Sequence, residues 1–273
     1  MKIITIDLYE YFNIARPESA AGYLTAYLLD EHDGHERRFR PAMLVIPGGG
    51  YAWLSDRERE PIALKFLERG FNAFTLKYSV YPVSYPYQLI EGAMAIAYIR
   101  ENYIDLGVDK EHVAAIGFSA GGHLCGMLAT LTGEQVVKDA LKDRFDICTP
   151  NAVVLSYPVI CADEKIAHNG SMEKISGGDN DLRAKLSLES RVSSSSVPAF
   201  IWATVNDEGV PSENSLNMAF AYKRANVPFE FHLFEDGRHG LACCDEETFY
   251  VNNEAKEWIK LSINWLKKRG FRL

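Results

Sequence analysis

The feature that most constrains this chain is the stretch VAAIGFSAGGHLCGMLA, residues 113–129, where an apolar run ends at a serine flanked by glycines. A short apolar run bounded by glycine is typical of a buried strand. The pattern therefore predicts a strand, Val113–Gly117, that turns sharply into a helix, Ala120–Thr130. Ser119 stands at that turn, where a polar hydroxyl has little structural use, so it is the first candidate for chemistry.

Strand-like and helix-like segments alternate along most of the chain. The candidate strands are Ile3–Leu8, Leu24–Leu29, Met43–Ile46, Ala73–Tyr78, Val113–Gly117, Ala152–Tyr157, Ala199–Thr204 and Phe229–Phe234. The candidate helices are Glu60–Arg69, Tyr87–Tyr103, Ala120–Thr130, Glu213–Ala225 and Glu254–Arg269. Alternation of this kind predicts an α/β fold with a mostly parallel central sheet of about eight strands and helices on both faces. The first strands have no helices between them, so we expect the N-terminal edge of the sheet to be antiparallel.

The 273 residues contain no internal repeat and no low-complexity linker, so we expect one domain spanning 1–273. One segment breaks the alternation. Residues 160–197 are polar, include GGDND and SSSS, and show no strand pattern. An insertion of this length after a sheet strand is either a lid or binding segment or a plain surface excursion, and the pattern does not separate the two.

Charge and composition argue against several classes of binding partner, among them nucleic acids and membranes. The net charge of -8 argues against a nucleic-acid-binding surface, and no apolar run approaches the ~18 residues of a membrane span. The N-terminus shows no signal-peptide pattern, which favours a cytoplasmic location. Five cysteines, odd in number and irregular in spacing, indicate reduced thiols and no metal site. They are Cys125, Cys148, Cys161, Cys243 and Cys244.

A nucleophilic serine needs a base, because a free hydroxyl reacts poorly. Of the seven histidines, His239 alone follows a predicted strand on a glycine-flanked loop, in EDGRHGL. His32 and His35 lie in a polar loop and are expected to be solvated. His123, four residues after Ser119 on the predicted helix, is expected to pack, because helical side chains lean back along the helix. His239 is therefore the candidate base.

The base in turn needs a carboxylate that orients it. The strand Ala199–Thr204 runs into Asn206-Asp207-Glu208, at the end of a strand that lies between the serine and the histidine in chain order. Asn206 carries no charge, and Glu208 is less well placed than Asp207. Each residue taken alone also fits a plain turn, but the order Ser119, Asp207, His239 is that of a nucleophile, acid and base on a strand–helix scaffold.

An acyl-transfer site also needs donors for a developing oxyanion. The run PGGGY, Pro47–Tyr51, follows a predicted strand, and its glycines leave backbone N–H groups free to point inward. Gly49, Gly50 and Ala120 are the candidate donors. A phosphate loop is a poorer interpretation, since no G-x-x-x-x-G-K spacing is present; a simple turn is the remaining alternative.

These motifs resemble the α/β-hydrolase superfamily and, within it, the small bacterial acetyl esterase and acetylxylan esterase-like group of lipases and esterases. The resemblance extends from about Met43 onward. Its most specific stretches are PGGGY, GFSAGGHL, NDEGVPSENSL and HLFEDGRHGL. One departure is Pro47, which replaces the first histidine of the His-Gly-Gly-Gly run in lipases of the hormone-sensitive type.

The resemblance implies an α/β-hydrolase fold in which Ser119 is the nucleophile, Asp207 the orienting acid and His239 the general base. It implies that Gly49, Gly50 and Ala120 form the oxyanion hole, and that neither a cofactor nor a metal takes part.

The expected function is that of a serine carboxylesterase acting on small-molecule esters with short acyl groups, acetyl above all, including carbohydrate esters. The same residues would also suit an amidase or formamidase, a thioesterase, or a non-catalytic binding protein of this fold. Four aromatic residues near predicted strand ends or the glycine loop are the candidate substrate contacts: Tyr51, Trp53, Tyr81 and Trp202.

Overall fold

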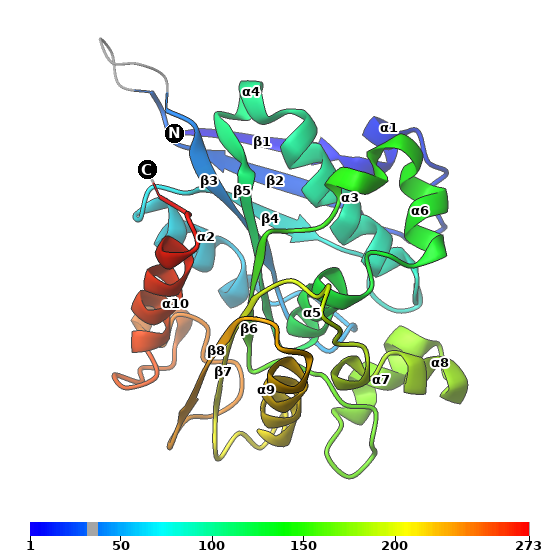
Figure 1. Ribbon diagram of the computed structural model, residues 1–273, viewed down its shortest axis with the longest axis vertical. Helices are drawn as coiled ribbons and strands as arrows, with labels where there is room; N and C mark the ends of the chain where they lie inside the picture. The colour runs from blue at the N-terminus through cyan, green and yellow to red at the C-terminus, as the bar shows by residue number, and fades with distance from the viewer. Residues whose placement is uncertain (32–37, 273) are drawn as a thin grey trace.

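The computed structural model describes residues 1–31 and 38–272 and shows one eight-stranded sheet in the order β1-β2-β4-β3-β5-β6-β7-β8 (Figure 1). The strands are β1 Lys2–Asp7, β2 Tyr23–Leu28, β3 Arg40–Ile46, β4 Asn72–Lys77, β5 Val108–Phe118, β6 Ala152–Ser156, β7 Ala199–Thr204 and β8 Phe229–Phe234. β1 and β2 are antiparallel to their neighbours, and the pairs from β4 through β8 are parallel. The predicted mixed sheet and its antiparallel edge are therefore confirmed.

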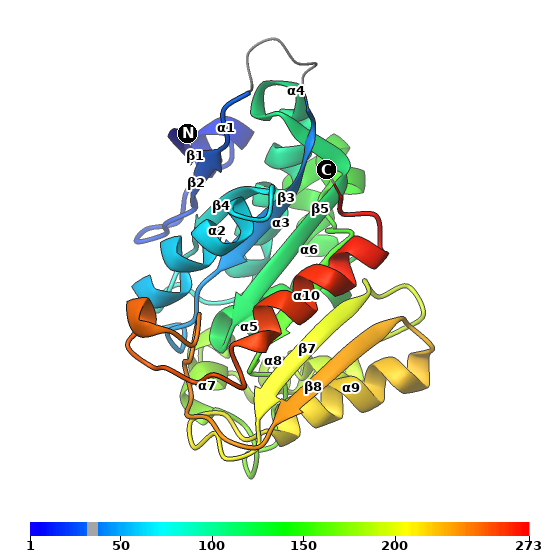
Figure 2. The same cartoon turned by 90° about the vertical axis from the view of Figure 1, so that its left-hand side faces the viewer.

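Helices cover both faces of the sheet. They are α1 Leu8–Phe12, α2 Glu60–Leu67, α3 Tyr87–Glu101, α4 Tyr103–Leu106, α5 Ala120–Thr130, α6 Gln135–Leu141, α7 Asn169–Ser176, α8 Asn180–Lys185, α9 Glu213–Ala225 and α10 Glu257–Lys268. α2 and α10 lie on one face, and α3, α5, α6 and α9 lie on the other (Figure 2). All five predicted helices are present with ends within a few residues of those expected.

Burial on both faces explains why the strands are continuous apolar runs. In β3, Leu44 and Ile46 belong to the core beneath α3 and α5, whereas Met43 and Val45 belong to the core beneath α2 and α10. All four side chains are fully buried. A strand covered on both sides has no solvent-facing residue, so the alternating pattern of a half-exposed strand is lost.

The segment 160–197 holds no strand, as expected, but it does hold α7 and α8, which the sequence analysis did not predict. Side-chain caps start both helices: the His168 ring accepts a hydrogen bond from the N–H of Ser171, and Asp179 accepts from the N–H groups of Asp181 and Leu182. The segment also buries Met172, Ile175 and Leu188 against the larger core. It is therefore a packed part of the molecule.

The remaining sequence expectations concern His32 and His35, the cysteines, membrane spans and metal sites. His32 and His35 lie outside the described residues. The five cysteines are all free and buried. In residues 1–31 and 38–272, no helix has the length and apolar character needed to cross a bilayer, and no cluster of three or more His, Cys, Asp or Glu side chains is arranged to hold a metal ion.

A buried carboxylate links the antiparallel edge to α3. Glu91 is fully buried; its oxygens accept hydrogen bonds from the Ser79 N–H at 2.6 Å, the Ser79 hydroxyl and the Tyr9 hydroxyl at 2.9 Å. Burial raises the pKa of Glu91 from 4.5 to about 7, against the opposing effect of these donors. The folded state therefore holds this proton more tightly than the unfolded chain does.

This shift predicts a pH-dependent stability that a Glu91→Gln substitution removes. A pKa raised on folding contributes stability that is complete below the unfolded value of about 4.5 and is lost as the pH rises through about 7. The unfolding free energy of wild type minus that of Glu91→Gln should therefore fall by roughly 2 kcal/mol between about pH 5 and about pH 8. Urea unfolding of both proteins measures this difference, and a difference that stays flat or rises with pH contradicts the assignment.

Candidate active site

Close packing between β5 and α5 shapes the turn that carries Ser119. A Cβ atom at Gly117 would lie 2.1 Å from the Gly121 carbonyl oxygen, and one at Gly121 would lie 2.3 Å from the carbonyl oxygens of Ile46 and Pro47. Only glycine fits at either position. Ser119 itself has φ 54° and ψ -118°, a strained conformation for a non-glycine residue that lifts its side chain out at the strand–helix junction.

Three residues that are far apart in the sequence form one hydrogen-bonded chain. The His239 Nε2 atom lies 2.8 Å from Ser119 Oγ, and His239 Nδ1 lies 2.8 Å from Asp207 Oδ2. Ser119 follows β5, Asp207 follows β7, and His239 follows β8, so all three stand at the carboxyl ends of parallel strands. The structure thus brings together the three side chains that the sequence analysis singled out.

Asp207 is held so that both of its oxygens have fixed partners. Its side chain is 1% exposed, and its Oδ1 accepts hydrogen bonds from the N–H groups of Gly209 at 2.8 Å and Val210 at 2.9 Å. Oδ2 is left to accept from His239 Nδ1–H. Asn206 instead donates to Asp236 and Glu208 is exposed, so Asp207 is the residue of this turn that contacts the imidazole.

The glycine loop lies beside the serine and leaves backbone donors available. Gly49 and Gly50 have φ values of +123° and +63°, and both border the pocket that contains Ser119. Among the described residues, no group accepts a hydrogen bond from the N–H groups of Gly49, Gly50 or Ala120. Ala120 is the first residue of α5, where backbone N–H groups have no acceptor within the helix. The loop and helix end can therefore donate to an added oxygen.

A buried carboxylate, not anticipated from the sequence, braces this loop. Glu58 accepts from the Gly48 N–H at 2.8 Å and from the Tyr157 hydroxyl at 2.8 Å, and that hydroxyl accepts from the Ala242 N–H at 2.9 Å. Burial and the neighbouring Glu58 carboxylate raise the pKa of Tyr157, so it stays a neutral donor. The Tyr157 ring packs edge-on against His239 with centroids 5.1 Å apart. Glu58 thus ties the glycine loop to the imidazole.

Two predicted substrate contacts are wrong, because the side chains are buried in the core. Tyr51 is 0% exposed, and its hydroxyl pairs with His123 Nδ1 at 2.9 Å. Trp202 is also 0% exposed; its Nε1–H donates to Ser156 Oγ at 2.8 Å, and its ring stacks on Trp258. Aromatic residues near strand ends fill the space between sheet and helices here, and they do not reach the pocket.

The other two aromatic candidates are exposed but differ in position. Trp53 borders the Ser119 pocket, whereas Tyr81, also exposed, is not among the residues that line it. His123 packs as predicted: its Nε2 contacts the Leu186 carbonyl at 2.9 Å, and burial lowers its pKa to about 4. His123 is therefore a neutral core residue.

The pocket at Ser119 has a volume of about 400 Å³ and draws its walls from four separate parts of the chain. Besides Ser119, His239 and the glycine loop, the lining includes Arg57, Arg238 and, from the segment 160–197, His168 and Lys174. Sequence reasoning missed these four side chains. Arg238 lies in the motif EDGRHGL but was given no role, and the other three lie in no recognisable motif.

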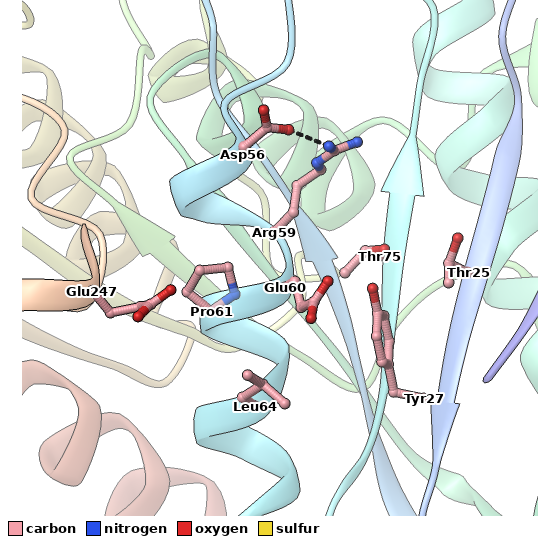
Figure 3. A pocket seen from close by; sticks show the side chains of 9 residues that line it. All are labelled: Thr25, Tyr27, Asp56, Arg59, Glu60, Pro61, Leu64, Thr75 and Glu247. Atoms are coloured by element: carbon pink, nitrogen blue, oxygen red, sulfur yellow. Dashed lines mark hydrogen bonds and ion pairs between the residues drawn. The ribbon is translucent and has the colours of Figure 1, made fainter. Parts of the chain in front are cut away.

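A second pocket opens between α2 and the strands β2 and β4 and shares no lining residue with the first (Figure 3). Thr25, Tyr27 and Thr75 face it from β2 and β4, and Asp56, Glu60 and Glu247 supply three carboxylates. Arg59 contributes the one positive charge among its lining residues and pairs with Asp56. The second pocket is therefore acidic, in contrast to the pocket at Ser119.

Comparison with protein families gives two matches. The BD-FAE family model matches residues 31–221, and the model of the dienelactone hydrolase family matches residues 182–270. The first of these covers Ser119, Asp207 and the glycine loop, and the second covers Asp207 and His239.

Comparison with individual proteins points the same way. The chain is 38% identical over 218 residues to endo-1,4-beta-xylanase B of Butyrivibrio fibrisolvens, and 26% identical over 207 residues to an acetylxylan esterase of Xylanibacter ruminicola. These matches cover 77% and 73% of this chain but only 34% and 41% of the relatives, so the chain spans well under half the length of either.

A solved structure matches over nearly its whole length. The acetyl ester-xyloside bifunctional hydrolase from Caldicellulosiruptor lactoaceticus is 36% identical, with a TM-score of 0.81 over 92% of this chain and 89% of that one. Sheet order, strand-turn-helix geometry and these matches agree. The chain belongs to the BD-FAE family, within the esterase group of the α/β-hydrolase superfamily.

Proposed function

We propose that this protein is a serine carboxylesterase that cleaves short acyl esters, with acetyl esters of carbohydrates as its preferred substrates. The observation that carries the proposal is the chain of two 2.8 Å contacts from Asp207 through His239 to Ser119. The acyl group and the carbohydrate are taken from the printed names of the similar proteins, an acetylxylan esterase and an acetyl ester-xyloside hydrolase. The free, buried cysteines fit the reducing cytoplasm as its location.

The first half of the proposed reaction forms an acyl-enzyme. Ser119 Oγ attacks the ester carbonyl while His239 Nε2 accepts its proton. This requires the neutral imidazole to carry its hydrogen on Nδ1, and Asp207 Oδ2 favours that tautomer by accepting from Nδ1–H. Asp207 also stabilises the imidazolium that forms, because its own charge is fixed 2.8 Å away.

The negative charge that develops on the carbonyl oxygen needs donors that are already in position. The N–H groups of Ala120, Gly49 and Gly50 are the donors in our proposal, and each is without an acceptor among the described residues. Donors fixed in advance need no reorganisation during the reaction, and losing one typically costs ~3 kcal/mol of transition-state stabilisation. His239 then protonates the leaving alcohol, and water removes the acyl group by the same steps in reverse.

The proposal predicts a steep dependence on acyl length. Among 4-nitrophenyl esters from acetate to octanoate, kcat/KM should be highest for acetate and should fall by at least about tenfold at octanoate, since each misplaced methylene costs on the order of 1 kcal/mol. Acetylated xylo-oligosaccharides should release acetate, measured by an enzymatic acetate assay. A maximum at octanoate would contradict the short-acyl proposal while leaving ester hydrolysis intact.

Other activities on the same residues remain outcomes of the experiment. Turnover of aryl formamides or acyl thioesters faster than of any oxygen ester would move the function to an amidase or a thioesterase. A binding protein of this fold would turn over none of them. Labelling by an organophosphate separates the last case, because only an activated serine becomes phosphorylated.

A further inference from the structure

Positive charge gathers at the pocket of Ser119 although the whole chain carries a net charge of -8. Arg57, Lys174 and Arg238 line this pocket. Within residues 1–31 and 38–272, none of the three forms an ion pair with a carboxylate. The pocket of Figure 3 is, by contrast, lined by three carboxylates and one arginine, Arg59, which is paired with Asp56.

The carboxylates near the site do not neutralise these cations. Glu58 lines the pocket but is buried and accepts hydrogen bonds from Gly48 and Tyr157. Asp207 is buried behind His239, and both of its oxygens accept hydrogen bonds from partners other than these cations. Glu208 borders an adjoining hollow together with Arg238 and makes no ion pair with it. The positive charges of Arg57, Lys174 and Arg238 are therefore available to an anionic ligand in the pocket.

Contacts with the protein hold each cation in place without using all of its donors. Arg57 Nη1 donates to the Gly240 carbonyl at 2.8 Å and to the Thr248 carbonyl at 3.5 Å. Arg57 and Arg238 lie over the ring of Tyr250, at 4.8 and 4.0 Å from its centroid. Lys174 Nζ donates to the Gly170 carbonyl at 3.2 Å. A guanidinium has five donor hydrogens and an ammonium three, so several remain for a ligand.

His168 adds a neutral donor to the same wall. His168 Nδ1 lies 2.7 Å from Ser171 Oγ and accepts a hydrogen bond from the Ser171 N–H at 3.2 Å. Because Nδ1 accepts from that N–H, we assign the lone pair to Nδ1 and the hydrogen of the neutral ring to Nε2. Burial lowers the pKa of His168, and the nearby His239 and Lys174 lower it further, which keeps the ring neutral. The ring borders the pocket, and its Cε1 would lie 3.6 Å from a Cβ at Gly50. Nε2–H has no acceptor among the described residues.

A buried hydroxyl completes the set. Ser55 is 3% exposed, lines the pocket, and its Oγ has no hydrogen-bond partner. Unpaired buried polar groups are rare in folded proteins, so a hydroxyl without a partner at this pocket needs an explanation. Among the described residues, the pocket therefore combines three cations that form no ion pair and two polar groups that have no hydrogen-bond partner, the Ser55 hydroxyl and His168 Nε2–H.

We propose that the Ser119 pocket binds an ester whose non-reacting part carries a carboxylate, held by Lys174 and Arg238 with His168 Nε2–H as a third donor. This inference rests on the proposed ester hydrolysis and narrows its substrates to anionic esters, such as acyl esters of acidic sugars. The carboxylate belongs either to the alcohol side or to the acyl side of the ester, and the chemistry that recognises it is the same.

Matched pairs of esters test the inference on each side. On the alcohol side, 4-acetoxybenzoate is compared with the uncharged 4-acetoxybenzamide; on the acyl side, mono-4-nitrophenyl glutarate is compared with 4-nitrophenyl pentanoate. We expect kcat/KM to favour the anionic member of one pair by about tenfold, after correction for leaving-group reactivity, and the preference to weaken as salt is added. Equal or lower kcat/KM for the anionic member of both pairs overturns the inference.

Variants assign the preference to the named residues. Lys174→Gln and Arg238→Gln should each lower the anionic-to-neutral ratio about fivefold, the effect of losing one partly exposed charge contact. Lys165→Gln, which removes an exposed lysine from the same segment outside the pocket, should leave the ratio unchanged. A ratio that falls as far in Lys165→Gln as in Lys174→Gln would mean that general charge, and not this pocket, selects the substrate.

Two substitutions separate the proposed ligand-binding role of His168 from its structural role as the cap of α7. Asparagine keeps a cap for α7 but loses the donor facing the pocket, whereas glutamine can still reach the pocket with an N–H. We expect His168→Asn to raise KM for the preferred anionic ester several-fold and His168→Gln to restore part of the loss. Equal KM values in wild type and His168→Asn would remove His168 from the subsite.

A binding measurement keeps this inference distinct from the proposed function. Titration calorimetry on Ser119→Ala should show tighter binding of 4-hydroxybenzoate than of 4-hydroxybenzamide, or of glutarate than of glutaramide. Preferential binding of an anion without turnover of any ester would support the pocket and refute the esterase. Turnover of neutral esters, with no preferential binding of either anion, would support the esterase and refute the anion-binding pocket.

Discussion

Replacing Ser119 with alanine is expected to lower kcat/KM for 4-nitrophenyl acetate by about 10⁵-fold. The oxygen that would attack the ester is Ser119 Oγ, already 2.8 Å from His239 Nε2, and no other hydroxyl in the described part of the chain makes that contact with His239. What should remain is the weak rate supplied by the backbone donors and by binding alone. The loss should appear in kcat and not only in KM, since the substitution removes the reacting atom.

The fold should survive this change, so the loss will report chemistry. Alanine and serine experience the same strain at φ 54°, and among the described residues the Ser119 side chain has no hydrogen-bond partner other than His239. The melting temperature of Ser119→Ala should therefore stay within a few degrees of wild type. Ser194→Ala, which changes an exposed serine in the segment 160–197, should retain full activity. Undiminished turnover by Ser119→Ala, or its continued labelling by an organophosphate, would rule out the serine mechanism.

The strands and the hydrogen-bonded residues were predictable because their signals are local. The run Ala199–Thr204 is apolar up to its last residue, as expected of a strand covered on both faces, and the structure gives β7 the same bounds. Parallel strands place their carboxyl ends at one edge of the sheet. Any polar residues directly after β5, β7 and β8 must therefore be neighbours, which is why Ser119, Asp207 and His239 could be grouped from sequence alone.

The errors share a different cause. Whether an aromatic side chain at a strand end turns into the core or toward a pocket depends on what packs against it. Trp202 is buried because Trp258, on α10, stacks on it at 5.2 Å between centroids. No sequence pattern near residue 202 predicts its contact with Trp258. The aromatic pattern alone therefore could not separate Trp202 from the exposed Trp53.

The pocket wall from the segment 160–197 was missed for the same reason. His168 and Lys174 have no motif around them, and α7 is short and polar. They border the pocket because Met172 and Ile175, on the same helix, are buried in the core. A capping histidine before a helix is one signal that could have indicated the start of α7, although His is a less common cap than Ser, Thr, Asp or Asn.

Replacing Asp207 with asparagine is expected to lower kcat/KM about 10⁴-fold, the size of the effect known for the equivalent change in a serine protease. The reason lies in the partners of each oxygen. Oδ1 accepts from the N–H groups of Gly209 and Val210, so the asparagine carbonyl must occupy that position. Its NH₂ group then takes the place of Oδ2 and faces His239 Nδ1 as a donor.

An amide donor at that position enforces the wrong tautomer. Nδ1 must accept, so the hydrogen of the neutral imidazole moves to Nε2, the atom that must take the proton from Ser119. The variant should fold normally, since the two backbone hydrogen bonds are kept, and urea unfolding tests this directly. Glu208→Gln, the same chemical change at the exposed neighbouring residue, should leave turnover of 4-nitrophenyl acetate within about twofold of wild type. If Asp207→Asn retains more than about a tenth of wild-type activity, the tautomer is not set by Asp207 and another group must orient the imidazole.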